Sequence, residues 1–300
     1  MRALVTGAAG FIGSHLIKKL LVKGHEVLAM DRLSESKKSL VSLFAGNSRI
    51  RFIKADLANK NDTKDEYFRN IDWVFHLGAV SRTQESLERP LYYHKVNVTG
   101  TFNILSASMR MGVKKFFYAG SASVYGVSPE IPTTENAPIL LDSPYAVSKF
   151  LAEKMVMHYG KIYKLPVISV RMVSVYGPKL YEGGTYGSIL TLFMGQKKAG
   201  KPFTVVGNGE QRKDLVYVAD AVEAILKLIH SPIKNEIFNI GGGRTYSIME
   251  IVEQLGGKIS YLPKRPWEGS FKQVDINKIR NFTGWDPKVG LREGIERILA

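Results

Sequence analysis

The sequence predicts an α/β protein in which a doubly wound, buried parallel sheet is accompanied by a smaller, interleaved C-terminal lobe. Two observations predict this fold class. Through the first half of the 300 residues, short apolar runs alternate with amphipathic stretches of helical length, and this alternation is typical of βαβ units in a parallel sheet. After Arg171 it gives way to glycines, prolines and short strand-like runs, which are typical of turns.

The predicted sheet is built from short apolar runs. These predicted strands are 3–6, 27–31, 51–54, 73–77, 115–121 and 167–171. The main predicted helices in this half are 12–22, 97–111 and 145–163. The first of them carries Ile12, Leu16 and Leu20 on one apolar stripe, as a helix that packs against a sheet requires.

The second half alternates less regularly. We expect a helix over 218–229, a short strand over 237–240, a helix over 247–255 and a last helix from residue 291. We assign residues 1–172, with 212–242 returning to them, to a nucleotide-binding domain. Residues 173–211 and 243–300 are assigned to a smaller, substrate-binding lobe.

The composition is that of an ordinary globular protein, with 45% hydrophobic and 23% charged residues. No apolar run reaches the roughly 18 residues of a membrane span, and the chain opens directly on a predicted strand. We therefore expect neither a membrane partner nor a cleaved signal. The sequence has no cysteine, which excludes disulfides and thiolate chemistry and fits a cytoplasmic protein.

The charge balance is strongly basic. Lys and Arg outnumber Asp and Glu by 42 to 27, a net charge of +15. The basic residues occur as scattered pairs such as Lys18-Lys19 and Lys114-Lys115, so we expect no nucleic acid partner. A basic surface also favours a substrate that carries a pyrophosphate.

A glycine-rich turn follows the first predicted strand and precedes the first predicted helix. Gly7, Gly10 and Gly13 stand in T-G-A-A-G-F-I-G, where glycines allow a pyrophosphate to approach the helix N-terminus closely. Asp31 ends the second predicted strand, where a carboxylate accepts hydrogen bonds from both ribose hydroxyls and repels a 2′-phosphate. The pattern predicts a Rossmann sheet that binds NAD, with a turn-forming role as the alternative for Asp31.

Two further polar residues lie on or after predicted strands. Asp56 follows the third strand and is a candidate for binding the adenine amino group, with a helix N-cap as the alternative. His76 lies on the fourth strand, where we expect a buried structural histidine rather than a catalytic one. No set of His, Asp and Glu has the spacing of metal ligands, so no metal is predicted.

Tyr145 and Lys149 are four residues apart in Y-A-V-S-K, so they face the same way on a helix. Tyrosine has an ordinary pKa of about 10, and a nearby ammonium and a positively charged nicotinamide both lower it. Tyr145 can then take a proton from a substrate hydroxyl as hydride leaves the same carbon. Ser121, at the end of the predicted strand 115–121, can hydrogen-bond the same oxygen.

In their order and spacing these motifs resemble the extended short-chain dehydrogenases/reductases, the nucleotide-sugar epimerase/dehydratase family. Further matches extend over nearly the whole chain: H-L-G-A from His76, N-V-T-G-T from Asn97, S-A-S-V-Y-G from Ser121, R-M-V-S-V-Y-G-P from Arg171, G-N-G-E-Q-R-K-D from Gly207 and G-W-D-P from Gly284. The resemblance implies an NAD-binding Rossmann domain, a small nucleotide-sugar lobe and commonly a homodimer through a four-helix bundle. By the resemblance Asn97 and Lys149 also hold NAD, and the full predicted cofactor set is Gly7, Gly10, Phe11, Ile12, Gly13, Asp31, Asp56, Leu57, Asn97, Tyr145 and Lys149.

The turn at Ser121-Ala122-Ser123 bears on the reaction. Dehydratases of the family carry Thr-Asp-Glu there, and that Asp and Glu remove water across C5 and C6 of the sugar; decarboxylating relatives also tend to keep the Glu. Ala122 cannot donate a proton and Ser123 is a poor base, so we expect neither reaction. The reaction that remains is 4-epimerisation through a transient 4-keto sugar, which needs only Ser121, Tyr145, Lys149 and NAD. The expected substrates are UDP-glucose and UDP-galactose.

Two other functions stay open at this point. One is another enzyme of the family, either a uronate epimerase or a net reductase, which would need external NAD(P)H. The other is a non-enzymatic NAD-sensing protein, but such proteins tend to lose the Tyr or the Lys, and this chain keeps both.

The predicted substrate contacts include two arginines. Arg265, in K-R-P-W-E-G, resembles the family's pyrophosphate-binding arginine, a planar and always charged group. Arg212 is the second candidate, because the family usually has Arg-Asp where this chain has Lys213-Asp214.

Three other positions bear on the substrate. Ser123 lies beside the catalytic serine, and Ser174 replaces the Asn that epimerases usually carry before V-Y-G-P. Lys272 lies where relatives screen the C2 substituent, so N-acetyl sugars are expected to be poor substrates. An exposed loop lysine is the alternative for Lys272.

The predicted helices 97–111 and 145–163 carry more apolar surface than one sheet contact needs. Besides Val98, Phe102 and Leu105, the first has a second stripe with Ile104 and Met111. A deeply buried helix and a dimer interface both explain this width, and the resemblance favours the homodimer.

Overall fold

The computed structural model describes residues 1–33, 44, 46–178, 189–263 and 273–299, and it confirms the predicted α/β fold. Its main sheet has seven strands in the order β10-β6-β5-β4-β1-β2-β3, all paired in parallel. These strands are β1 (Arg2–Thr6), β2 (Glu26–Asp31), β3 (Ile50–Lys54), β4 (Trp73–His76), β5 (Lys115–Ser121), β6 (Val167–Met172) and β10 (Glu236–Ile240). Because the strand order reverses between β1 and β4, ligands are expected beyond the carboxyl ends of these strands.

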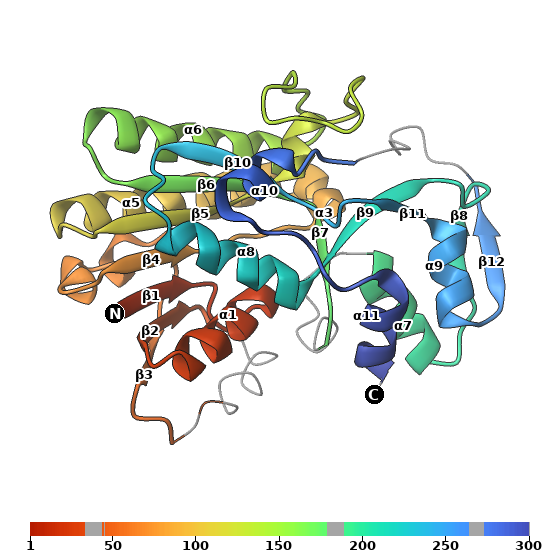
Figure 1. Cartoon of the computed structure of the whole chain (residues 1–300), viewed down its shortest axis with the longest axis horizontal. Coiled ribbons are helices and arrows are strands. Elements are labelled where there is room, and N and C mark those ends of the chain that lie inside the picture. Colours follow the sequence, from red (N-terminus) through yellow and green to blue (C-terminus); the bar gives the residue numbers. More distant parts are fainter. Residues whose placement is uncertain (34–43, 45, 179–188, 264–272, 300) are drawn as a thin grey trace.

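Helices cover both faces of this sheet, because successive strand residues point into two separate cores. Ala3 and Val5 of β1 pack in one apolar cluster, and Leu4 between them packs in the other. This alternation is what a strand buried on both faces produces. The covering helices, seen in Figure 1 as the pairs α1 with α8 and α5 with α6, are α1 (Phe11–Val22), α8 (Val218–His230), α5 (Gly100–Arg110) and α6 (Pro144–Ile162).

The predicted helix 97–111 starts earlier in the structure and contains a wide turn. Here α4 (Pro90–His94) continues through a π-helical turn, η4 (Lys95–Thr99), into α5. The wide turn contacts α6 and turns Asn97 into the interior, where it is 1% exposed. Turns of this kind often mark functional sites.

The rest of the chain forms two short sheets, which with the helices beside them are called the lobe below. One of these sheets includes β9, which the predicted division assigns to the nucleotide-binding domain. In it, β9 lies between β7 and β11, and in the other β8 pairs in parallel with β12. The remaining strands and longer helices of the chain are β7 (Ser174–Tyr176), α7 (Ile189–Lys198), β8 (Phe203–Val206), β9 (Arg212–Tyr217), β11 (Thr245–Ser247), α9 (Ile248–Leu255), β12 (Ile259–Leu262), α10 (Asn277–Thr283) and α11 (Leu291–Leu299). Figure 1 shows α7, α9 and α11 gathered beside these strands, away from the main sheet.

Sequence periodicity located most elements to within a residue or two at each end. The predicted strand 115–121 coincides with β5, and the predicted helix 145–163 lies within one residue of α6 at both ends. Short helical turns complete the first half: η2 (Lys60–Asp62), η3 (Asp65–Phe68), α3 (Thr83–Glu88) and η5 (Ala122–Tyr125). Among the residues described, no helix combines the length and apolar character needed to span a bilayer.

Candidate active site

The glycine turn between β1 and α1 packs closely against the backbone that follows β4. A Cβ built on Gly7, whose φ is +65°, would lie 2.8 Å from the Cα of Gly78, and one on Gly13 would lie 2.2 Å from the carbonyl oxygen of Gly7. Glycine is therefore required at both positions. No described side chain caps α1 at Gly10, so the N–H groups of its first turn form a cradle that fits a pyrophosphate. That turn holds three of the predicted NAD contacts, Phe11, Ile12 and Gly13.

Asp31 lies beside this turn, because β1 and β2 are neighbours and end at the same edge of the sheet. Its Oδ2 accepts a hydrogen bond from the N–H of Ala9 at 3.1 Å, and its Oδ1 accepts one from Leu33 at 3.1 Å. The side chain is 5% exposed. The adjacent Arg32 donates to the hydroxyl of Tyr92 at 2.6 Å. The carboxylate is thus fixed next to the cradle, where a ribose of the cofactor would lie.

Asp56 and Leu57 follow β3. The Asp56 carboxylate accepts a hydrogen bond from the N–H of Ala58 at 3.0 Å, which is the local turn contact that aspartate commonly makes. Leu57 is buried, and its Cδ1 lies 2.5 Å from where a Cβ on Gly78 would be. Both residues therefore shape the loop beside the glycine turn.

Asn97 links three segments through its amide. Its Oδ1 accepts from the N–H of Val80 at 2.9 Å, and its Nδ2 donates to the Val80 carbonyl at 3.0 Å and to Ser148 Oγ at 2.9 Å. These contacts hold the loop after β4 against α6. The structure thus places Asn97 against Ser148 of α6, the residue before Lys149.

The serine turn brings Ser121 and Tyr145 together. Ser121 Oγ accepts hydrogen bonds from the backbone N–H of Ser123 at 3.2 Å and from its hydroxyl at 2.9 Å. Burial raises the pKa of Tyr145, and a hydrogen bond from Ser121 opposes this rise. Because Ser121 accepts both bonds from Ser123, its own hydrogen is free to point at the Tyr145 oxygen.

Lys149 lies one turn further along α6. Its Nζ donates to the carbonyl oxygen of Ala119 at 2.6 Å and lies 4.5 Å from the centre of the Tyr118 ring. Burial lowers the pKa of Lys149 to about 7, and the Glu153 carboxylate opposes this. The contribution that opposes the rise of the Tyr145 pKa comes from Ser121, and the Lys149 ammonium donates to the backbone of β5.

Local contacts fix the start of α6, on which these side chains stand. Ser143 caps the helix by accepting from the N–H of Ala146 at 3.2 Å, and Pro144 occupies its first position. The N–H of Tyr145 donates to Ser86 Oγ at 3.2 Å. The Tyr93 ring meets the Tyr145 ring edge to face, with centroids 6.3 Å apart.

Of the predicted substrate contacts, Ser174 lies two residues after Met172, the β6 residue that pairs with Ser121. Ser174 begins β7, and Arg212 begins β9. The Arg212 guanidinium donates to the hydroxyl and carbonyl oxygens of Thr245, both at 2.9 Å, and pairs with Glu250 at 3.3 Å. It borders a cavity of about 640 Å³ whose lining, among described residues, includes Arg244 but neither Ser121 nor Tyr145. Arg265 and Lys272 lie outside the described residues.

His76 is a buried structural residue, as predicted. Its Nδ1 and Nε2 hydrogen-bond to the hydroxyls of Thr6 at 2.7 Å and Thr101 at 2.9 Å. Burial lowers its pKa to about 3. No cluster of three or more His, Cys, Asp or Glu that could hold a metal ion occurs in the part of the chain described.

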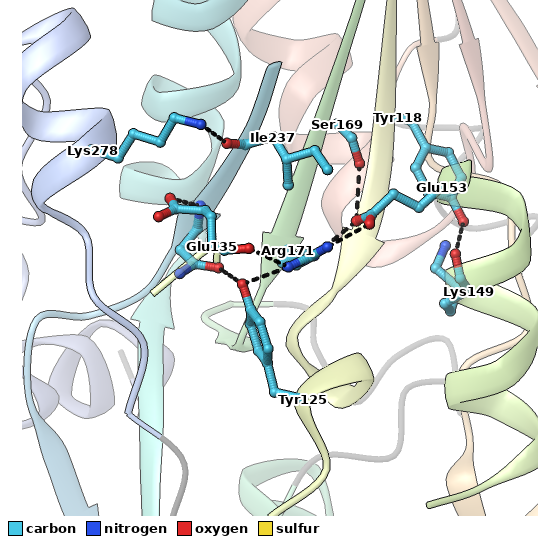
Figure 2. Close-up of polar contacts among 10 residues, drawn as sticks. Tyr118, Tyr125, Glu135, Lys149, Glu153, Ser169, Arg171, Ile237 and Lys278 are labelled. Carbon is cyan, nitrogen blue, oxygen red and sulfur yellow. Dashed lines mark hydrogen bonds and ion pairs between the residues drawn. The ribbon is translucent and has the colours of Figure 1, made fainter. Parts of the chain in front are cut away.

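A buried polar network next to the site was not predicted from the sequence. Figure 2 shows Arg171 between Glu153 and Tyr125, with Glu135 close by. Two signals in the sequence could have indicated it: a buried strand, β6, that carries an arginine among mainly apolar residues, and Glu153 four residues after Lys149 on the same helical face.

The parallel sheet, the glycine cradle and the adjoining Ser121, Tyr145 and Lys149 are those of a Rossmann-fold, NAD-dependent enzyme. The model of the NAD dependent epimerase/dehydratase family matches residues 3–241, and the chain belongs to this family. The predicted family and the predicted cofactor, NAD, are confirmed.

Three relatives illustrate the range of the family. The chain is 32% identical to a putative UDP-glucose 4-epimerase of Methanocaldococcus jannaschii, covering 99% of this chain and 96% of that protein. The crystal structure of UDP-glucuronic acid 4-epimerase from Bacillus cereus, in complex with UDP-glucuronic acid and NAD, superposes with a TM-score of 0.92 at 29% identity, over 99% and 98% of the chains. That of UDP-glucose 4-epimerase from Thermotoga maritima, with UDP-glucose, gives 0.91 at 30% identity, over 100% and 97%.

Proposed function

We propose that the protein is a 4-epimerase of a nucleotide-diphospho sugar, with UDP-glucose and UDP-galactose as its substrate pair. The observation that carries this proposal is the serine turn: Ser121 stands at the end of β5 and opposes the rise of the Tyr145 pKa, and Ala122 and Ser123 offer no carboxylic acid or carboxylate. Dehydration across C5 and C6 needs such a pair, whereas exchange at C4 needs one group that gives and takes a single proton.

Each residue of the set has one task in this reaction. Tyr145 removes the proton of the sugar 4-hydroxyl and returns it once the 4-keto sugar has turned over in the pocket. Ser121 donates a hydrogen bond that favours the tyrosinate, and Lys149 adds positive charge from the same face of α6. NAD, held at the glycine cradle and Asp31, supplies the hydride acceptor and donor for C4.

The substrate is proposed to bind between the sheet edge and the smaller lobe, the division being residues 1–172 with 212–242 against 173–211 and 243–300. Ser123 would contact the sugar, with Ser174, Arg212 and Arg265 toward the diphosphate. The relatives named UDP-glucose 4-epimerase support the sugar. The equally good superposition on the UDP-glucuronic acid enzyme makes a uronate epimerase the second candidate.

We also propose a homodimer built from α5 and α6, in a cytoplasmic enzyme. Apolar side chains on these helices remain exposed, which a single chain does not explain: Phe102 at 48%, Leu151 at 41% and Ile162 at 53%. The location rests on the absence of cysteine. Size-exclusion chromatography with light scattering measures the mass, and a monomer of 33.5 kDa would exclude the dimer.

The deciding experiment is incubation of the purified protein with UDP-glucose and no added cofactor, followed by chromatography of the sugars. UDP-galactose that forms without a net change in NADH absorbance supports the proposal. If only UDP-glucuronate is converted, the uronate epimerase replaces it. Conversion that requires added NAD(P)H in proportion to product indicates a net reductase instead.

A further inference from the structure

A buried ion pair joins α6 to β6 behind the proposed catalytic residues. Arg171 donates from Nη2 to Glu153 Oε1 at 2.7 Å and from Nε to Oε2 at 3.0 Å. The two side chains are 3% and 1% exposed. Ser169 adds a longer contact to Oε2 at 3.4 Å. Figure 2 shows the bidentate pair on the side of β6 that faces α6.

Such a pair needs an explanation other than stability. Removing two charges from water costs about as much as their attraction returns, so apolar side chains of similar volume are often as stabilising. In some proteins a buried pair fixes one arrangement of the surrounding groups. The position of Glu153 indicates what is fixed here.

The carboxylate lies directly behind the end of β5. Glu153 follows Tyr145 by two helical turns and Lys149 by one, on the same face. A Cβ on Gly120, the residue before Ser121, would lie 3.5 Å from Glu153 Oε2. The ion pair therefore touches both the helix that carries Tyr145 and the strand end that carries Ser121.

The other side of Arg171 holds the far end of the serine turn. Its Nη1 donates to the hydroxyl of Tyr125 at 2.9 Å and to the carbonyl oxygen of Glu135 at 3.0 Å. Tyr125 is the last residue of η5, and its hydroxyl donates to Asn239 Oδ1 at 2.8 Å. The guanidinium carbon also lies 4.9 Å from the centre of the Tyr125 ring.

Resting on the proposed 4-epimerase function, we propose that Arg171 and Glu153 are positioning residues for Ser121 and Tyr145. Arg171 contacts α6 through Glu153 and the last residue of η5, the turn that follows Ser121, through Tyr125. It therefore sets the distance between α6 and that turn. The approach of the Ser121 hydroxyl to the Tyr145 oxygen depends on that distance. Nothing in this role requires contact with the sugar.

The carboxylate has a second effect, on Lys149. The titratable groups around Lys149 are Tyr145 and Glu153 on its own helix, Tyr118 on β5 and His76 on β4. Of these, Glu153 supplies the negative charge that opposes the lowering of the Lys149 pKa by burial. Neutralising Glu153 would therefore lower the pKa of Lys149 further, so its ammonium, and the activity that needs it, would be lost at lower pH.

The test compares Tyr125→Phe with Tyr159→Phe. Each removes one buried tyrosine hydroxyl, from the serine turn in the first case and from a contact with Ser106 at 2.8 Å in the second. Tyr125→Phe is expected to lower kcat roughly tenfold or more at nearly unchanged KM, because small displacements of reacting groups are costly. Tyr159→Phe is expected to keep wild-type kcat; equal kcat in the two variants overturns the proposal.

Two further variants separate positioning from folding. Glu153→Gln is expected to lower kcat and move the alkaline limb of the kcat profile to lower pH. The double variant Glu153→Gln with Arg171→Met carries no unpaired buried charge, so it is expected to melt near the wild-type temperature while kcat stays low. Recovery of wild-type kcat and pH profile in the double variant would mean that the pair is structural only.

A readout without any sugar keeps this inference separate from the proposed function. The pKa of Tyr145 is measured from tyrosinate absorbance, as the difference between each protein and the same protein with Tyr145→Phe. In Tyr125→Phe and Glu153→Gln the Tyr145 pKa is expected to rise, because the Ser121 hydrogen bond weakens. An unchanged Tyr145 pKa refutes positioning, whichever sugar the enzyme uses.

Discussion

Two arginine–glutamate pairs, each joining a strand to a helix, differ in their access to water. One joins Arg171, near the end of β6, to Glu153 of α6, and the other joins Arg212, at the start of β9, to Glu250 of α9. Arg171 and Glu153, at the sheet, are 3% and 1% exposed, whereas Arg212 and Glu250, in the smaller lobe, are 38% and 48% exposed. The sheet pair is closed on every side by further donors and acceptors. The lobe pair borders an open cavity of about 640 Å³.

The two pairs differ in how freely their side chains can rearrange. Breaking a buried pair leaves an unpaired buried charge, at a cost of about 3–5 kcal/mol, so the pair resists rearrangement. An exposed pair is screened by water and can rearrange at little cost. The rigid set of Ser121, Tyr145 and Lys149 lies beside the buried pair, and the surface proposed to meet a variable nucleotide sugar lies beside the exposed one.

The largest expected effect distinguishes Tyr145 of α6 from Tyr176 of β7. Tyr145→Phe removes the proposed proton carrier and is expected to lower kcat by roughly 10²- to 10⁴-fold while NAD stays bound. Tyr176→Phe also removes a buried hydroxyl, which donates to the Gly290 carbonyl at 3.1 Å, but is expected to keep kcat near wild type. Turnover assays and bound-NAD content check both, and full activity in Tyr145→Phe removes the central claim.

The second prediction breaks the two ion pairs by the same substitution. Arg171→Ala leaves Glu153 charged and buried, which is expected to cost about 3–5 kcal/mol of the free energy of unfolding. Arg212→Ala is expected to cost about 1 kcal/mol or less, because both partners remain solvated. Urea unfolding of the two variants measures this, and equal losses would show that burial does not distinguish the pairs.

The third prediction concerns how stability changes with pH. A buried histidine of the main sheet and a buried aspartate of the lobe are expected to change it in opposite directions. Burial lowers the pKa of His76 from 6.5 to about 3. Below pH 6.5 His76 binds a proton in the unfolded chain but not in the folded protein, so stability is lost as pH falls from 6.5 toward 3. In the lobe, burial raises the pKa of Asp214 from 3.8 to about 7. The folded protein holds that proton longer, so stability is lost as pH rises from 3.8 toward 7.

Single variants separate these two slopes. His76→Gln is expected to flatten the loss of stability below pH 6.5, and Asp214→Asn is expected to steepen it, because the opposing slope is gone. His158→Gln, at an exposed histidine of α6, serves as the control with an unchanged profile. The free energy of unfolding, measured at a series of pH values, decides whether each variant moves in its stated direction.

The smallest expected effect comes from replacing the serine that caps each of two helices. Ser143 caps α6 and Ser247 caps α9, each accepting an N–H three residues on. Replacing either serine by alanine is expected to cost about 1 kcal/mol of stability. Only Ser143→Ala is expected also to lower kcat, because Tyr145 stands two residues after that cap. A matching loss of kcat in Ser247→Ala would mean that the lobe is as tightly coupled to the chemistry as the sheet edge.

Much of the sheet and of the proposed site could be predicted because the signals are local. The strand 115–121, the glycines at Gly7 and Gly13, and the four-residue spacing of Tyr145 and Lys149 each depend on a few adjacent residues. Apolar periodicity fixes which face of an element is buried, and parallel strands bring their ends to one edge. These local signals therefore predict that Ser121 lies near Tyr145.

Other features depend on residues far apart in the chain, and only the tertiary structure decided them. The π turn over Lys95–Thr99 is held where Asn97 meets Val80 and Ser148, and no local pattern specifies those partners. Arg212 turned out to face Thr245 and Glu250 because β9 pairs with β11. The sequence by itself determined the elements, the cofactor class and the Tyr–Lys set, since short-range sterics and periodicity encode them. The structure decided which buried charges meet, since desolvation forces partners to be chosen across the packed core.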